Sequence, residues 1–194
     1  MPTPLVDLSV ANYLSTLSAR TSTPGGGSAA ALTAAQGVSL LSMVCEFTQP
    51  ESEPLAAIKR ECASAQKALL RLVQKDADAF KDVMKWYKDP DSDNYQQAVE
   101  GAIAVSVNIM REASKLIDVS DYLAENGNKN LITDVAIGAN FLACAIQCAL
   151  VNVLINCRSV SNDVIRTQAN QETKKILDVA ERLNSIYLRI RDNL

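Results

Sequence analysis

The chain has 194 residues, 48% of them hydrophobic and 21% charged, which is enough for one globular domain, residues 1–194, with a core of its own. Its net charge of -3 and the lack of a basic run argue against nucleic acid or a membrane surface as the main partner. It has no histidine and its five cysteines form no CxxC pair, so we expect no metal site and assign proton transfer to Asp, Glu, Lys, Tyr or water.

The N-terminal part of the chain is typical of a cytoplasmic protein. Residues 1–7 have neither the basic nor the apolar region of a signal peptide, and most cysteines lie in apolar stripes, as expected for reduced thiols. Apolar residues at helical spacing then predict a first helix over residues 5–19.

A proline and three glycines precede the second predicted helix, residues 28–47. Pro24 ends the preceding segment, and Gly25, Gly26 and Gly27 allow positive φ and leave the backbone bare. Ser28 suits an N-cap, and alanines follow it. The free N–H groups of such a helix start can bind an anion or an oxyanion; the alternative is a tight turn that permits close helix packing.

The third predicted helix, residues 55–87, carries a regular apolar stripe with steps of three and four residues, as in a helical bundle. Asp76 occupies a position of this stripe where an apolar residue is expected. A carboxylate there is either buried, with a partner or a shifted pKa, or solvated at the rim of the stripe. Asp76 is therefore a candidate functional residue.

Three further helices are predicted over residues 95–123, 131–157 and 161–191, with a loop over 125–130. Residues 135–155 are apolar apart from three amides and are long enough to span a bilayer. They are rich in small residues and lack aromatic belts and basic flanks, so we expect a buried central helix instead. The fold class is an all-α bundle of about six helices, three of them long.

Polar residues mark both ends of the fifth predicted helix. Asp134 and Asn152 are five turns apart on one face, ~27 Å along a straight axis, so one reacting centre cannot touch both within a subunit. Either they serve two ends of a long ligand, or an antiparallel partner in a two-fold dimer brings them together. Alternatively, Asn152 and Asn156 bond to backbone carbonyls, and Asp134 stabilises the helix dipole.

Four segments, residues 23–32, 76–80, 127–134 and 152–156, resemble in order and spacing the motifs of the formiminotetrahydrofolate cyclodeaminase and methenyltetrahydrofolate cyclohydrolase family. The resemblance spans nearly the whole chain. It implies an all-α homodimer that acts on tetrahydrofolate carrying a one-carbon unit, with no bound prosthetic group. The implied catalytic residues are Asp134 and Asp76, and the implied substrate-binding residues are Pro24, Gly25, Gly26, Gly27, Ser28, Asn128, Asn130, Thr133 and Asn152.

The implied reaction is the hydrolysis of 5,10-methenyltetrahydrofolate to 10-formyltetrahydrofolate, a cyclohydrolase activity. Asp134 would be the base or would orient the water, and Asp76 would be the partner acid or would contact the pterin. The alternatives are a formiminotetrahydrofolate cyclodeaminase that releases ammonia and a folate-binding homologue without activity. Compared with the family pattern, residues 48–51 contain no basic residue, and Lys88 in residues 87–90 does not match the position of the family's lysine, which favours the last alternative.

Overall fold

The computed structural model describes residues 3–194, and within them it contains α-helices, two short 3₁₀-helices and no β-strand. The all-α class predicted from the sequence is confirmed. The elements are η1 (Leu5–Asp7), α1 (Val10–Ser18), α2 (Gly26–Glu46), α3 (Glu53–Trp86), α4 (Asp93–Ser114), α5 (Ile117–Asn126), η2 (Lys129–Leu131), α6 (Ile132–Cys157) and α7 (Asp163–Arg191).

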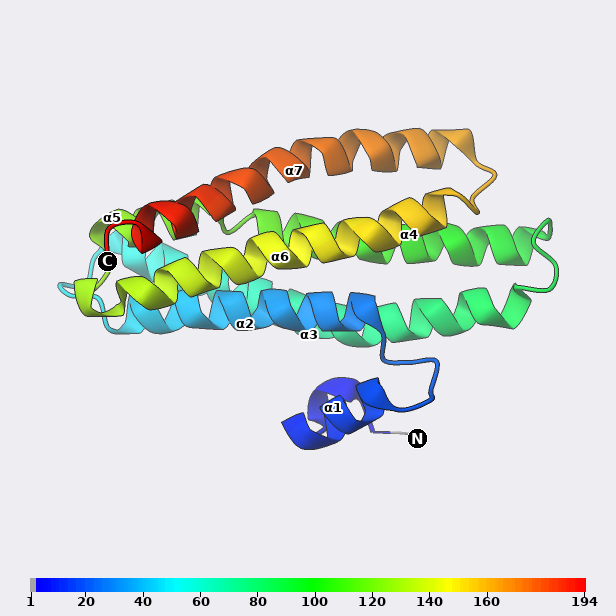
Figure 1. Ribbon diagram of the computed structural model, residues 1–194, viewed down its shortest axis with the longest axis horizontal. Coiled ribbons are helices and arrows are strands. Elements are labelled where there is room, and N and C mark those ends of the chain that lie inside the picture. The colour runs from blue at the N-terminus through cyan, green and yellow to red at the C-terminus, as the bar shows by residue number, and fades with distance from the viewer. Residues whose placement is uncertain (1–2) are drawn as a thin grey trace.

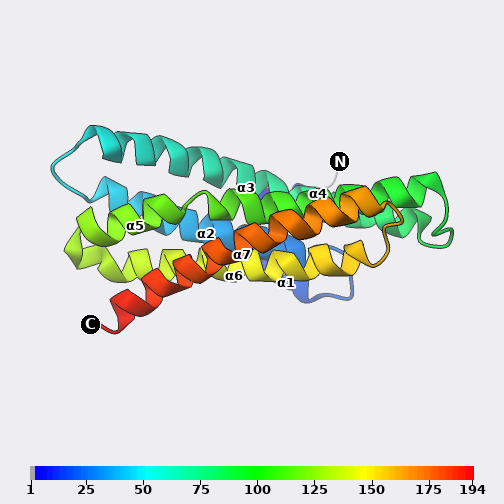
Figure 2. The same cartoon turned by 90° about the horizontal axis from the view of Figure 1, so that it is seen from above.

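The long helices lie side by side along the longest axis of the molecule (Figure 1). Helix α2 packs most extensively on α6 and α3, and α7 lies over α6 and crosses it at an angle (Figure 2). Helix α1 lies outside this bundle, beside α2 and α3, and a loop leads from it to the start of α2 (Figure 1).

Two glycines bring α2 and α6 together at the centre of the bundle. A Cβ atom added at Gly37 would lie 2.8 Å from the carbonyl oxygen of Gly138, and one added at Gly138 would lie 3.1 Å from the carbonyl oxygen of Gly37. Both glycines are buried, so the two backbones are in direct contact here. This contact holds α2 and α6, which carry most of the candidate site residues, at a fixed separation.

We therefore expect Gly37→Ala to lower the free energy of unfolding by about 1–3 kcal/mol, because the added methyl group forces two backbones apart. Gly101→Ala is the matched control, since a Cβ atom there meets nothing within 4 Å. It should raise stability by up to about 1 kcal/mol through helix propensity. Urea denaturation of both variants measures the difference, and equal stabilities would contradict the close contact.

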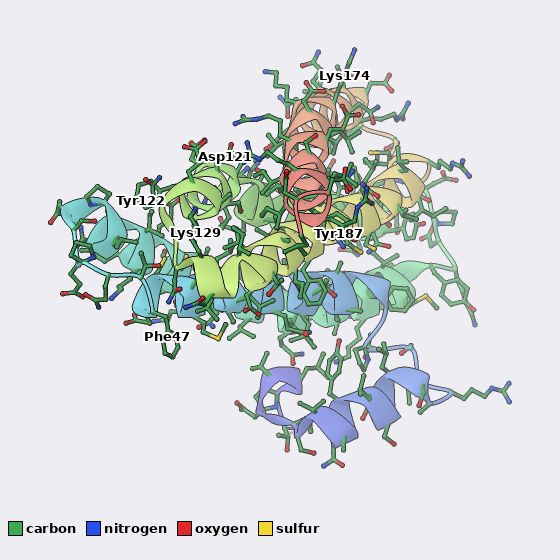
Figure 3. All side chains as sticks on the ribbon, turned by 60° about the vertical axis from the view of Figure 1, so that its left-hand side comes forward. Phe47, Asp121, Tyr122, Lys129, Lys174 and Tyr187 are labelled. Carbon is green, nitrogen blue, oxygen red and sulfur yellow. The ribbon has the colours of Figure 1, made fainter. Side chains whose placement is uncertain are left out.

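The predicted helix over residues 95–123 is two helices, which corrects the sequence-based boundary. Helix α4 ends at Ser114, whose hydroxyl donates to the Arg111 carbonyl, and the N–H of Leu116 bonds to Ala113 in a tight turn. No glycine or proline marks the break. The turn lets α5 pack on α6 and α7, where Arg182 and Arg189 of α7 reach Asp121 of α5 at 3.4 and 3.5 Å (Figure 3).

Helix α6 is a buried core helix, as predicted, but it is not buried on all sides. One side packs on α2, α4 and α7, and the other leaves large apolar side chains exposed: Ile137, Val151, Leu154 and Ile155. We call these four residues the α6 apolar stripe. Helices α2 and α6 are long and apolar enough to cross a membrane by length and composition, but about half of each is buried against the rest of the chain, as in a core helix.

Candidate functional site

The glycine loop ends directly beside Asp76. The backbone N–H of Ser28 donates to Asp76 Oδ2 at 2.7 Å, and the Ser28 hydroxyl lies 3.0 Å from the same oxygen. The hydroxyl has one proton, and the Val73 carbonyl at 2.8 Å is its nearer acceptor, so Ser28 ties the first turn of α2 to the middle of α3. Asp76 is partly buried and bonded, and the alternative of a solvated rim residue is wrong.

The helix start differs from the sequence-based prediction in two ways. Gly25 is the N-cap of α2, and Ser28 lies inside the first turn, fully buried. No glycine within residues 3–194 has a positive φ. The loop therefore does not need glycine for an unusual backbone conformation.

Close approach explains why position 27 is a glycine. A Cβ atom added at Gly27 would overlap the Asp76 carboxylate and would lie 2.8 Å from Asn152 Nδ2. At Gly25 and Gly26 an added Cβ would meet nothing within 4 Å. Gly27 thus lets the start of α2 fit between a carboxylate of α3 and an amide of α6.

A cavity of about 280 Å³ opens at this junction. Its walls come from the loop before α2 and from α2, α3, α4 and α6. The lining residues are Ser22, Thr23, Gly25, Gly26, Gly27, Asp76, Ala79, Phe80, Ala102, Ser106, Asn152, Ile155 and Asn156. The lining therefore combines one carboxylate and two side-chain amides with apolar walls, a composition that is usual for small-molecule sites.

Burial is the main influence on the charge of Asp76. It raises the pKa of the carboxyl, and the two hydrogen bonds from Ser28, which favour the ionised form, lower it less. An Asp with a raised pKa in a cavity is a candidate functional group.

The raised pKa of Asp76 makes stability depend on pH. Between the unfolded-state pKa and the higher folded-state pKa, the folded protein binds more protons than the unfolded chain. The free energy of unfolding should therefore fall as pH rises through this window and stay lower above it. We expect Asp76→Asn to be more stable than wild type at neutral pH and to lose that advantage in acid. Thermal melts across pH test this, and lower stability of the variant at every pH would contradict it.

Tyr13 links α1 to the same site. It is the one buried residue of α1, and its hydroxyl has no hydrogen-bond partner among residues 3–194. Burial raises its pKa, and the negative charge of Asp76 raises it further. The phenol therefore stays neutral and lies close enough to Asp76 to sense its charge.

Because the buried hydroxyl of Tyr13 has no protein partner, we expect Tyr13→Phe to raise the free energy of unfolding by up to about 1 kcal/mol. The phenyl ring would keep the packing between α1 and the bundle. Chemical denaturation gives the difference. A loss of 1 kcal/mol or more would show that the hydroxyl makes a stabilising bond.

A second group of predicted residues lies at the other end of α6. The N–H of Asn128 donates to Thr48 Oγ1 at 3.0 Å, and its side-chain amide donates to the Phe47 carbonyl at 2.8 Å. The Asn128 side chain also accepts from the N–H of Asn130 at 3.0 Å. Figure 3 views this end, where Phe47 points away from the bundle. Asn128 thus fastens the loop before α6 to the end of α2.

Thr133 and Asp134 lie in the first turn of α6, the former exposed and the latter partly buried. They are 18 or more residues from Asn152, which is ~27 Å along the helix. One chain therefore brings together Asp76, the glycine loop and Asn152, and separates them from Asp134.

The predicted binding residues near the glycine loop do not all reach the cavity. Pro24 and Ser28 are buried behind its wall, so Ser28 acts on the cavity through Asp76. Sequence reasoning missed Phe80 and Ser106. Phe80 follows Asp76 by four residues, about one helical turn, so both lie on one face of the helix. This spacing in the sequence could have predicted that Phe80 lies beside Asp76.

These features define an all-α bundle protein with a small-molecule cavity at the junction of four helices. In the part of the chain that the structure describes, no three Cys, Asp or Glu side chains gather as metal ligands would.

The chain belongs to the formiminotransferase-cyclodeaminase family, which it matches over residues 9–175. It is 26% identical over 201 aligned residues to the methenyltetrahydrofolate cyclohydrolase of Methylorubrum extorquens, covering 95% of this chain and 97% of that one. It is 29% identical to the formimidoyltransferase-cyclodeaminase of Mus musculus, where the match covers 95% of this chain but 37% of the mouse protein.

The fold is also similar to that of a solved member of this family. The crystal structure of formiminotetrahydrofolate cyclodeaminase from Thermotoga maritima superposes with a TM-score of 0.90 and 28% sequence identity, covering 96% of this chain and 97% of that one. The family resemblance predicted from the sequence motifs is confirmed. The relatives are folate cyclohydrolase and cyclodeaminase enzymes.

Proposed function

We propose that this chain is a methenyltetrahydrofolate cyclohydrolase that converts 5,10-methenyltetrahydrofolate and water to 10-formyltetrahydrofolate. The full-length match to the cyclohydrolase of Methylorubrum extorquens supports this choice. The observation that carries the proposal is the partly buried Asp76 at the glycine loop, because its cavity supplies a carboxylate and backbone donors without a histidine.

The substrate carbon is an amidinium carbon between N5 and N10, so it is already electrophilic. A water molecule attacks it, and a carboxylate takes the proton that the water loses. The tetrahedral intermediate then loses its hydroxyl proton and breaks its bond to N5, which takes up a proton as it leaves, so that the formyl group stays on N10. We assign the base, or the group that orients the water, to Asp134.

The glycine loop and Asp76 serve the same step. The N–H groups of Gly26 and Gly27 open the first turn of α2 and can bond to the oxygen of the intermediate. Asp76 is either the partner acid or the contact to the pterin. Asn128, Asn130, Thr133 and Asn152 stay candidate binding residues.

The distance between Asp76 and Asp134 supports a two-fold homodimer. An antiparallel partner would bring its own Asp134 to the end of α6 that carries Asn152. The α6 apolar stripe is an apolar face that such a partner would cover. Ile155 belongs to this stripe and also lines the cavity, so the cavity borders the face that we assign to the dimer.

A folate-binding protein without activity is the second candidate, and a specific observation favours it. Lys59 is a cation near the segment that lacks the usual basic residues, but it pairs with Glu46 at 3.0 Å and Glu51 at 3.1 Å. Its charge is therefore already matched within the chain. The third candidate is a cyclodeaminase that releases ammonia from formiminotetrahydrofolate, the activity that names the Thermotoga maritima structure.

The decay of methenyltetrahydrofolate absorbance with purified protein tests the proposal. We expect a rate well above buffer and no ammonia from formiminotetrahydrofolate. Ammonia release would favour the cyclodeaminase, and tight folate binding without any acceleration would favour the binding protein. Either result would overturn the proposed activity.

A further inference from the structure

The outer side of α6 carries a heptad pattern. The residues that follow one another there at alternating steps of three and four are all exposed or half-buried: Asp134, Ile137, Phe141, Cys144, Cys148, Val151, Ile155 and Arg158. We call these residues the α6 seam. Such a pattern is typical of a helix that packs along a second helix. The helices of the same chain contact the other side of α6, so the partner of the seam has to come from another chain.

The α6 seam is complementary to a second copy of itself. Opposite charges occupy its two ends, and two thiols occupy its centre. When two copies lie antiparallel and centred on each other, Asp134 faces the partner's Arg158, Ile137 faces the partner's Ile155, Phe141 faces the partner's Val151, and Cys144 faces the partner's Cys148. A two-fold interface needs a surface that matches itself in this way.

The charges at the ends of the seam favour this arrangement over others. None of the ion pairs within residues 3–194 uses Asp134 or Arg158, so both charges are available to a second copy. A parallel pairing would set each charge against the same charge of the partner, which is destabilising. An antiparallel pairing shifted by one heptad would set Asp134 against the partner's Val151 and leave the carboxylate without a partner.

The two thiols of one chain already lie together at the centre of the seam. Cys144 Sγ and Cys148 Sγ are 3.9 Å apart, and both residues are exposed and free. A disulfide within the helix would distort it, because Cβ atoms four residues apart are about 5–6 Å from each other and a disulfide needs about 3.5–4.5 Å. In the centred pairing each thiol also faces a thiol of the second copy, so four thiols gather at the two-fold axis.

We propose that Cys144 and Cys148 form a thiol site between two copies of this chain, in which Cys144 of each copy faces the partner's Cys148 and oxidation joins the two by a disulfide. This inference rests on the homodimer of the proposed function. Each disulfide forms as two thiols give two protons and two electrons to an oxidant such as diamide, a diazenedicarboxamide that is reduced to the hydrazine. The same pairing brings the partner's Asp134 to Arg158, about one turn beyond Ile155 at the cavity.

Electrophoresis without reducing agent, after treatment with diamide, tests the thiol site. We expect wild type to run as a cross-linked dimer and Cys144→Ser and Cys148→Ser each to lose the dimer band, because every remaining thiol then faces a hydroxyl. A heterodimer of these two variants, isolated with two affinity tags, should regain the band, since one Cys148 in it faces one Cys144. Cys157→Ser, which removes a buried thiol, is the matched control and should cross-link like wild type.

Charge reversal tests the same pairing without any thiol. Arg158→Glu should weaken the homodimer by about tenfold or more in sedimentation experiments, because it sets like charges against each other at both ends of the seam. The double variant Asp134→Lys and Arg158→Glu should restore the dimer, since it exchanges the two charges. Lys174→Glu, on the exposed surface of α7, is the control and should stay as dimeric as wild type.

Three results would overturn the inference: a dimer band from either cysteine variant alone, a heterodimer without the band, or a double charge variant no more dimeric than Arg158→Glu. Neither experiment involves folate, so the outcome is separate from that of the proposed activity. Cross-linking in the heterodimer without cyclohydrolase turnover would support the thiol site and overturn the activity. Turnover of methenyltetrahydrofolate by a protein whose heterodimer gives no band would do the reverse.

Discussion

Replacement of Gly27 by alanine should weaken folate binding by about 10- to 100-fold, more than any other single methyl group added to the glycine loop. The added Cβ atom would overlap the Asp76 carboxylate and press on the Asn152 amide, and neither can move away without breaking other contacts. Asp76 is held by Ser28, which is held in turn by Val73. Overpacking of this kind costs about 1–3 kcal/mol of folding stability. A carboxylate displaced from the cavity also loses a charged hydrogen bond to the ligand of about 1.5–3 kcal/mol, which corresponds to the stated loss of affinity.

Gly26→Ala is the matched control for this experiment, because a Cβ atom one residue earlier meets nothing within 4 Å. We expect its free energy of unfolding to stay within about 0.5 kcal/mol of wild type. Calorimetry with 5-formyltetrahydrofolate gives the affinity of Gly27→Ala, and circular dichroism shows whether α2 still forms. Wild-type affinity in Gly27→Ala would mean that the close packing of Gly27 against Asp76 and Asn152 is not needed for folate binding.

A heterodimer of Asp76→Asn and Asp134→Asn subunits should regain about half of the wild-type activity, although each variant alone is nearly inactive. If each site takes Asp76 from one subunit and Asp134 from the other, the heterodimer contains one intact site and one doubly altered site. Co-expression with two different affinity tags isolates this species. The rate of methenyltetrahydrofolate decay then counts the intact sites.

The same experiment separates the dimer proposal from a site within one subunit. If Asp76 and Asp134 acted within the same chain, both sites of the heterodimer would be altered and the activity would stay near zero. Full activity of the Asp134→Asn homodimer would remove Asp134 from the mechanism. Light scattering on the wild-type protein gives the number of subunits independently.

Helix periodicity made most of the fold predictable. The regular stripe of α3 gave its length to within two residues at each end, and it made Asp76 conspicuous as a polar residue at an apolar position. The break between α4 and α5 was not predictable, because it depends on a hydroxyl bond from Ser114 and on tertiary packing, not on glycine or proline.

Some parts of the site could not be read from the sequence. Tyr13 belongs to the apolar stripe of its helix, but periodicity did not distinguish it, as the buried member, from Val10 and Leu14, which are exposed. The role of Gly27 depends on what faces it across the bundle, so the sequence could not distinguish it from Gly25 and Gly26. The exposure of one side of α6 could not be predicted either. An apolar stripe has the same sequence pattern whether it packs against its own chain or against a partner.

A structure of the protein with bound 5-formyltetrahydrofolate tests the central claim most directly. We expect the folate to lie in the cavity between Gly27, Asp76 and Asn152, with its one-carbon group toward Asp134 of a second copy. A folate bound elsewhere on the bundle, with Asp76 facing an empty cavity, would contradict it.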